Sequence, residues 1–160
     1  MTVMPQKTEK SQENVVDNLK VILADTYVLY VKTQNFHWNI TGPQFRELHL
    51  FFEGLYKELA NAVDDIAERI RMLHRRAPGT MQTFLKLTSI KESEEALSED
   101  EMLSQLFADH EKMIKSLKSR IQICQNDGDE GTADLLIQRL RAHEKAAWML
   151  RSHLENPEHR

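Results

Sequence analysis

Apolar residues recur at spacings of three and four along several long stretches of the chain, a pattern typical of helices that bury one face. The first predicted helix covers residues 11–39 and ends before Gly42-Pro43. The second covers residues 44–75 and stops at Ala77-Pro78-Gly79, because glycine and proline interrupt a helix. Its apolar stripe is the most regular in the chain and comprises Leu48, Phe51, Phe52, Leu55, Leu59, Ala62, Val63, Ile66, Ile70 and Leu73.

Two further helices are predicted in the second half of the chain. The third begins at Ser98, and Glu101 follows three residues later, which is the spacing of a capping box. In that motif each side chain accepts a hydrogen bond from a backbone N–H at the start of the helix. The third helix ends at Asn126-Asp127-Gly128, and the fourth ends before Pro157.

A long connection, residues 78–97, separates the second and third helices, and within it residues 81–87 have the pattern of a short extra helix. Four amphipathic helices joined by two short turns and one long crossover are typical of a ferritin-like four-helix bundle. We therefore predict an all-α, ferritin-like bundle domain over residues 11–156, with tails at residues 1–10 and 157–160.

The composition of the chain favours a globular protein without a membrane-spanning helix. The chain has 160 residues, 41% hydrophobic and 29% charged, which suits one globular domain with its own core. Its single cysteine, Cys124, cannot form an internal disulfide and favours a reducing compartment. The polar start lacks the apolar run of a signal peptide, and no stretch approaches the roughly 20 apolar residues of a membrane helix. We expect a cytoplasmic protein with no membrane partner, and association with the nucleoid is left open.

A second face of the helix over residues 44–75 carries side chains that can bind metal. His49 and Glu53 are four residues apart, as are Asp64 and Glu68, so each pair shares a face. The two pairs are fifteen residues apart, about 22 Å along the axis at 1.5 Å per residue. Metal ligands lie within about 2 Å of their ion. One chain therefore cannot bring both pairs to one metal.

Two copies of this helix, packed antiparallel about a two-fold axis, would unite the pairs and create two equal sites. His37 lies just before the Gly42-Pro43 turn and comes to a height similar to that of His49. The chain has no E-x-x-H spacing, so an iron site inside one bundle is not expected. Two imidazoles and three carboxylates suit iron or zinc, and the carboxylate excess favours iron. Each site would hold His37, His49 and Glu53 of one subunit with Asp64 and Glu68 of the other.

The candidate ligands lie within a longer set of residues that resembles the signature of a known family. The set comprises Thr33 to Asn39, Gly42, Phe45, Leu48, His49, Phe52, Tyr56, Asp64, Ala67, Glu68 and Arg69, together with Glu144 to Leu150. They resemble the signature of the Dps family of mini-ferritins over nearly the whole chain. The resemblance implies a hollow twelve-subunit shell built from two-fold dimers, with ferroxidase sites at the dimer interfaces and room for two iron ions at each. It also implies hydrogen peroxide as the favoured oxidant of Fe(II), and a stored ferric mineral.

Further roles follow from this resemblance. Many relatives have aspartate where this chain has Glu53, which has a longer reach. Trp38 and Tyr56 are expected near the site, where the family places aromatic residues that intercept radicals. An acidic run near the third turn is expected to line the pores through which iron enters the shell, and its alternative is solvated charge at a helix N-terminus. This run comprises Asp129, Glu130 and Asp134.

The remaining histidines, the cysteine and several other residues have simpler structural explanations. His143 lies on an apolar stripe and is expected to be a core histidine, and Cys124 a small buried residue. Glu68 could simply pair with Arg69 or Arg71, a contact worth little at a surface. Trp148 and the methionines are expected to be packing residues. The other histidines are expected at the surface; they are His74, His110, His153 and His159.

Two functions are weighed on this basis. The first is a ferroxidase that stores iron and thereby protects the cell from oxidative damage. The second is an architectural DNA-binding protein, although twelve subunits at −4 each carry about −48, which repels phosphates at neutral pH. In the N-terminal tail, Lys7 and Lys10 are offset by Glu9 and Glu13, so we expect weak or absent DNA binding. A helical scaffold without chemistry would not explain why five metal-binding side chains converge.

Overall fold

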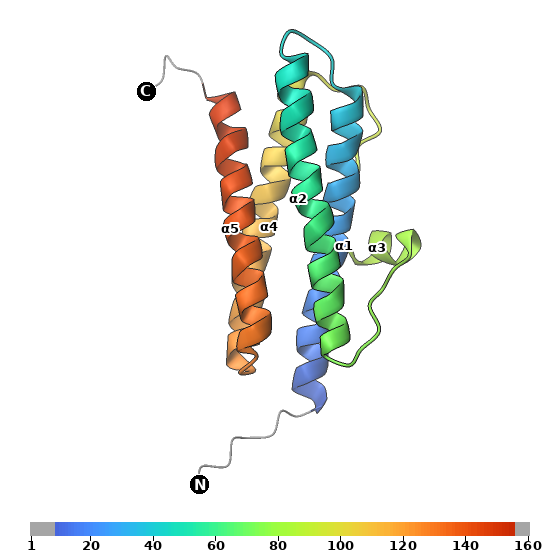
Figure 1. The fold of residues 1–160 in the computed structure, drawn as a ribbon, viewed down its shortest axis with the longest axis vertical. Coiled ribbons are helices and arrows are strands. Elements are labelled where there is room, and N and C mark those ends of the chain that lie inside the picture. Colours follow the sequence, from blue (N-terminus) through green and yellow to red (C-terminus); the bar gives the residue numbers. More distant parts are fainter. Residues whose placement is uncertain (1–8, 156–160) are drawn as a thin grey trace.

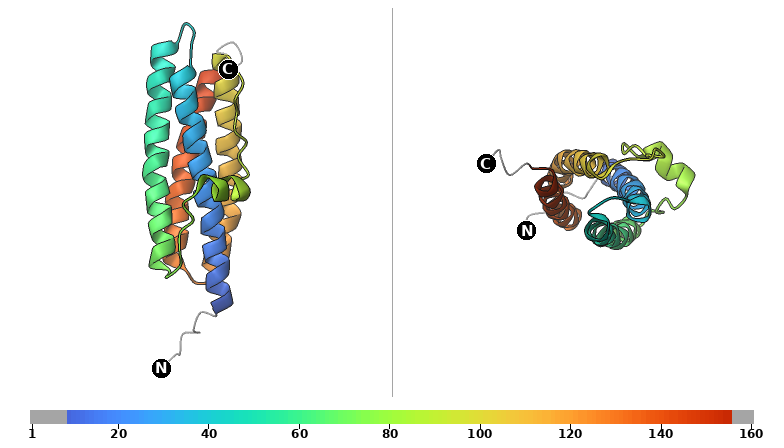
Figure 2. Two further views of the ribbon diagram at one scale, coloured as in Figure 1. Left: turned by 90° about the vertical axis from the view of Figure 1, so that its right-hand side faces the viewer. Right: turned by 90° about the horizontal axis from the view of Figure 1, so that it is seen from above.

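The computed structural model describes residues 9–155 and consists of helices and the turns that join them. The helices are α1 (Glu9–Asn39), α2 (Phe45–Met72), α3 (Met81–Leu87), α4 (Glu99–Asn126) and α5 (Glu130–Leu154). The four long helices run lengthwise as a bundle, and the short α3 lies outside it beside α1 (Figures 1 and 2). This confirms the predicted all-α bundle with a short extra helix in its long connection. Within the described range, none of the helices combines the length and apolarity needed to cross a bilayer.

Helix boundaries lie close to the predicted ones. α1 begins at Glu9, two residues before the predicted start. α2 ends at Met72 rather than at Arg75, because His74 adopts a φ of 62°, in the left-handed region that closes helices. At the start of α4, Ser98 and Glu101 form the predicted capping box. Such local signals predict helix ends well because each depends on a few neighbouring residues.

The core lies between two helical pairs. α1 packs on α2, α4 packs on α5, and the two pairs face each other across the bundle (Figure 2). Burying one large apolar side chain contributes about 1.5–3 kcal/mol, so this interior is the main stabilising element of the subunit. Cys124 and His143 are buried in it, as predicted. Its fully buried side chains include Leu19, Leu29, Phe36, Phe52, Leu59, Ile66, Leu106, Leu117, Leu136 and Leu150.

Two predictions about exposure were wrong. His110, predicted at the surface, is only 2% exposed, and its Nδ1 lies 2.8 Å from Nδ1 of His143. The two rings can be buried because each provides a hydrogen-bonding partner for the other. Trp148, predicted to pack, is 55% exposed on the single chain. Of the methionines, Met72 and Met81 are 62% and 57% exposed, whereas Met102 and Met113 are buried in the core as predicted. His74 is exposed and His153 is half-buried, whereas His159 lies outside the described residues.

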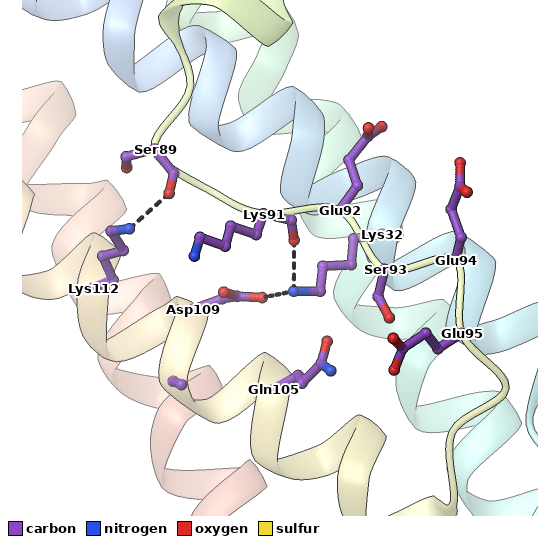
Figure 3. Close-up of a pocket in the computed structure, with 11 residues that line it drawn as sticks. Lys32, Ser89, Lys91, Glu92, Ser93, Glu94, Glu95, Gln105, Asp109 and Lys112 are labelled. Atoms are coloured by element: carbon purple, nitrogen blue, oxygen red, sulfur yellow. Dashed lines mark hydrogen bonds and ion pairs between the residues drawn. The ribbon is translucent and has the colours of Figure 1, made fainter.

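Polar contacts fix the long connection to the bundle. The buried carboxylate of Asp25 accepts hydrogen bonds from the backbone N–H of Ser89, at 2.7 Å, and from its hydroxyl. Farther along α1, the buried Lys32 ammonium donates to the backbone carbonyl of Lys91 at 2.8 Å and pairs with Asp109 of α4 at 2.7 Å (Figure 3). Burial raises the pKa of Asp109, and the charge of Lys32 opposes that effect. Lys32, Lys91 and Asp109 line a polar pocket of about 670 Å³. Their contacts and those of Asp25 hold the crossover in place.

Candidate metal centre

The turn between α1 and α2 places the end of one helix beside the start of the next. Gly42 has a φ of +124°, which side chains disfavour, and a Cβ there would lie 2.5 Å from Oε1 of Glu99. That same oxygen accepts a hydrogen bond from the backbone N–H of Gln44 at 2.9 Å. The positive φ is what favours glycine here, because the Glu99 carboxylate ends a flexible side chain and could move aside at the loss of this hydrogen bond. The tight turn brings His37 next to His49.

The two imidazole rings stack with their centroids 3.8 Å apart and their planes 13° apart. Nδ1 of His37 lies 2.6 Å from the backbone carbonyl oxygen of His49, and Nδ1 of His49 lies 2.7 Å from that of His37. A carbonyl oxygen only accepts, so each Nδ1 carries a proton and donates it. Each Nε2 in the neutral ring is then left with a lone pair. Metal-binding histidines are oriented in this way by a hydrogen bond at the other ring nitrogen.

Aromatic rings enclose this histidine pair. Phe45 stacks on His49 at 5.1 Å, and Tyr56 approaches His37 edge-on at 5.1 Å. His37 is buried and His49 is half-buried, so the rings are held firmly while one side stays open. Tyr56 thus lies beside His37. Trp38 follows His37 in sequence, but its side chain is 66% exposed on the single chain.

Glu53 lies one turn beyond His49 on α2. Its carboxylate pairs with Lys57 at 2.9 Å, and this hydrogen bond and charge lower the pKa of Glu53. Burial opposes this effect, and the nearby His37 and His49 contribute to the lowering. Lys57 was not predicted from the sequence, although its spacing of four residues from Glu53 is that of a helical ion pair. A metal ion at the histidines would compete with Lys57 for this carboxylate.

The other two candidate ligands lie elsewhere on the same helix. Asp64 and Glu68 are exposed on α2, fifteen and nineteen residues beyond His49, so they cannot reach its ring within one subunit. Within the described residues, no group of three or more His, Cys, Asp or Glu side chains could hold a metal ion. A single chain therefore brings His37 and His49 together, with Glu53 one helical turn beyond His49, and leaves Asp64 and Glu68 apart from them.

The acidic run before α5 divides into two kinds of residue. Asp129 is only 4% exposed: it caps α5 by accepting from the backbone N–H of Thr132 at 3.0 Å, and it pairs with Arg69 at 3.0 Å. Arg69 therefore binds the cap rather than Glu68. Glu130 and Asp134 are exposed on the first turns of α5, so the pore prediction rests on these two.

Comparisons with known proteins agree with this architecture. A family model for ferritin-like domains matches residues 16–159. DNA protection during starvation protein 2 of Bacillus anthracis is 41% identical over 142 residues, which is 89% of this chain and 97% of that protein. A crystal structure of a Dps protein from Bacillus brevis aligns with a TM-score of 0.90 at 36% identity, over 92% of this chain and 99% of that one. A Dps protein from Vibrio cholerae, a member of the ferritin-like diiron-carboxylate superfamily, aligns with a TM-score of 0.89 at 29% identity, over 96% and 100% of the two chains. The chain therefore belongs to the Dps family of ferritin-like proteins.

Proposed function

We propose that this protein is a ferroxidase and iron-storage mini-ferritin whose reactive sites form between two subunits. The observation that carries the proposal is the histidine pair itself. His37 and His49 stack against each other, and each donates from Nδ1 to a backbone carbonyl, which leaves the Nε2 lone pair of each ring available to a metal ion. The carboxylates that would complete a site, Asp64 and Glu68, are exposed on the same helix. Antiparallel pairing of two α2 helices would bring the two halves together twice.

Such a site suits the oxidation of iron. Imidazole and carboxylate groups bind Fe(II), and carboxylates also stabilise the added positive charge of Fe(III). With hydrogen peroxide as oxidant, two Fe(II) ions each lose one electron, the O–O bond breaks, and two protons complete two molecules of water. Three carboxylates and two imidazoles can hold the two ions that this reaction consumes. The product would be stored as ferric mineral inside a shell.

Exposed apolar side chains support assembly into that shell. Within the described part of the chain, six large apolar residues are each more than half exposed on the single chain, namely Trp38, Leu50, Met72, Met81, Leu85 and Trp148. Contact with neighbouring subunits would remove such surface from water. A dodecamer of two-fold dimers would have a solution mass near twelve times 18.7 kDa, which light scattering measures directly.

Mixed subunits test whether each site is shared between two chains. We would prepare one inactive variant, His37→Ala/His49→Ala, and a second inactive variant, Asp64→Asn/Glu68→Gln, and then coexpress them. In each mixed dimer one site loses all four groups, whereas the other combines two intact halves. With random pairing, about a quarter of all sites regain activity in the stopped-flow oxidation of Fe(II) by peroxide.

The matched control coexpresses His37→Ala with His49→Ala. These two substitutions affect the same half of the site, so every mixed site keeps a defect and the oxidation rate stays at the background level. If the first mixture is as inactive as its two parents, the site is not shared between subunits. Wild-type rates in both parents would show that these residues do not oxidise iron at all.

A further inference from the structure

A groove of about 410 Å³ runs between α2 and α5, and His110 of α4 adds to its lining. The two helices are neighbours that run in opposite directions (Figure 1). Two contacts fix their register: the rings of Phe51 and His153 lie 5.0 Å apart towards one end, and Glu58 pairs with Arg139 at the other. None of the candidate metal ligands lines the groove, and its volume is that of a typical small-molecule site.

The two ends of the groove differ in polarity. Seven residues separate Phe51 from Glu58 on α2, which corresponds to roughly 10 Å along the helix. Towards one end the lining is apolar and comprises Phe51, Leu55, Ala146 and Met149. Towards the other end it is polar and comprises Glu58, His110, Arg139 and His143. A molecule lying along the groove therefore needs an apolar body and one polar head.

Hydrogen-bond donors exceed acceptors at the polar end. Nη1 and Nη2 of Arg139 donate to the Glu58 carboxylate, and Nη2 also lies 3.4 Å from Nε2 of His143. His143 therefore donates from Nδ1 to Nδ1 of His110, which leaves the His110 proton on Nε2. In the described part of the chain, this Nε2 and Nε of Arg139 are buried donors without a partner. With Lys145, the lining carries two positive charges and one negative charge, which favours an anionic head.

Glu58 shows how Arg139 binds a carboxylate here. A contact through both Nη atoms is the geometry in which a guanidinium group recognises a carboxylate. The side chain of Arg139 is buried, whereas that of Glu58 is 45% exposed. An exposed glutamate can turn into water, and a carboxylate from solution can then take its place on Arg139. The tail of that molecule would lie along the apolar part of the groove.

Gly54 leaves the middle of the groove without a side chain. It lies in the interior of α2, where glycine destabilises a helix relative to alanine. A Cβ at this position would have no atom within 4 Å, and the backbone φ is not positive. Neither packing nor backbone conformation within the described chain therefore calls for glycine at this position. The absent side chain widens the groove.

We propose that this groove binds a free medium-chain fatty acid. Its carboxylate replaces that of Glu58 on Arg139, and its aliphatic tail packs between Phe51 and Met149. Decanoate has a length that suits this span and a single negative charge, which neutralises the excess positive charge of the lining. The binding is independent of the proposed ferroxidase function, because it involves none of the candidate metal ligands.

Isothermal titration of the metal-free protein with decanoate, below its micelle concentration, tests the position of the head. We expect decanol to bind at least roughly tenfold more weakly than decanoate, because it lacks the charged partner of Arg139. Glu58→Gln weakens the competing contact within the chain, so it should bind decanoate several-fold more tightly. Glu111→Gln removes a negative charge at an exposed position of α4 and should bind as the wild type does.

Gly54→Met tests the groove itself. Its side chain would narrow the groove, so we expect decanoate to bind at least roughly tenfold more weakly, through loss of apolar contact. Gly79→Met is the matched control, because a Cβ there also has no atom within 4 Å but the residue lies outside the groove. Circular dichroism shows that each variant is folded.

Three results would overturn the proposal. Equal affinity for decanol and decanoate would remove the carboxylate from Arg139, and so would unchanged or weaker binding by Glu58→Gln. Wild-type affinity in Gly54→Met would place decanoate outside the groove. Absence of binding in both the wild type and Glu58→Gln would show that the groove does not take a fatty acid. Each result is obtained without iron, so it leaves the test of the ferroxidase function untouched.

Discussion

His37 and His49 hold each other in place: each imidazole donates through Nδ1 to the backbone carbonyl oxygen of the other residue, at 2.6 and 2.7 Å. The acceptors are main-chain atoms at the end of α1 and in the first turns of α2, so the orientation of both rings is set by the tight turn at Gly42. The orientation of the two rings is thus set by the fold itself. A pre-formed ligand pair loses little side-chain entropy on binding, which favours tight binding.

The substitution His49→Asn separates this orienting hydrogen bond from metal binding. Asparagine can still donate to the carbonyl of His37, but it has no atom at the position of Nε2. We expect the fold and the oligomer to persist, and the affinity for Zn²⁺ or Fe(II) to fall by roughly 10-fold or more. Isothermal titration with Zn²⁺ measures the loss. His74→Asn, at an exposed histidine beyond the end of α2, is the control and should bind as the wild type does.

Glu53 provides a second prediction, because Lys57 competes for its carboxylate. Lys57→Met removes the hydrogen bond and charge that lower the pKa of Glu53, and it frees the side chain for a metal ion. We expect Zn²⁺ to bind several-fold more tightly to Lys57→Met at neutral pH, and several-fold more weakly to Glu53→Gln. Lys118→Met, at an exposed lysine of α4, controls for loss of positive charge. Unchanged affinity in both test variants would remove Glu53 from the ligand set.

The sequence allowed much of this architecture to be predicted, because its signals are local. Apolar spacing and the Ser98–Glu101 box placed the helices, and helical geometry alone separated His49 from Asp64. Contacts between polar side chains on different helices could not be predicted from the sequence in this way. His110 meets a histidine thirty-three residues later, and Asp129 meets Arg69 sixty residues earlier. No local pattern distinguishes such a buried polar residue from a solvated one.

Asp129 and Asp134 differ in burial, and their substitution should have different effects. Asp129→Ala removes the α5 cap and leaves Arg69 without its carboxylate, so we expect a loss of about 1–2 kcal/mol in unfolding free energy. Asp134→Asn is at an exposed position and should stay within about 0.5 kcal/mol of the wild type. Urea unfolding followed by circular dichroism measures both.

The exposed carboxylates at the start of α5 provide a test of the pore prediction. If Glu130 and Asp134 concentrate cations at a pore, Glu130→Gln/Asp134→Asn should slow iron uptake into the shell while the initial oxidation at low iron stays normal. An uptake rate equal to that of the wild type would show that these carboxylates are only solvated charges.

DNA binding is expected to be weak or absent. The net charge of −4 per chain gives an assembled shell a negative potential that repels phosphates. In a gel shift at neutral pH and moderate salt we expect no retarded band, with binding restored at most by divalent cations or low pH. A tight complex that weakens steeply with salt would contradict this and favour the architectural role. If no such complex forms, any protection of DNA would come from removal of iron and peroxide.

His110 and His143 form a buried hydrogen-bonded network with Arg139. Nη2 of Arg139 lies 3.4 Å from Nε2 of His143, so that nitrogen accepts and the proton of His143 resides on Nδ1. This Nδ1 donates to Nδ1 of His110 at 2.8 Å. Burial, aided by the charge of Arg139, lowers the pKa of His110 to about 3. Burial and the neighbouring His110 and Arg139 lower the pKa of His143 well below its usual value. Both rings are therefore neutral in the folded protein.

Acid should destabilise the subunit through these two rings. Below the ordinary histidine pKa of about 6.5 the unfolded chain binds protons that the folded chain does not, so stability falls as pH falls. The slope is at most about 1.4 kcal/mol per pH unit for each ring, and it continues down to the folded pKa near 3. Replacing both rings, as in His110→Leu/His143→Leu, avoids leaving one donor unpaired and should flatten the decline in Tm between pH 6.5 and 4.5. His74→Leu should keep the wild-type slope, and light scattering at each pH separates unfolding from dissociation of the oligomer. A wild-type Tm that does not change over this range would show that the two rings are not kept neutral by the fold.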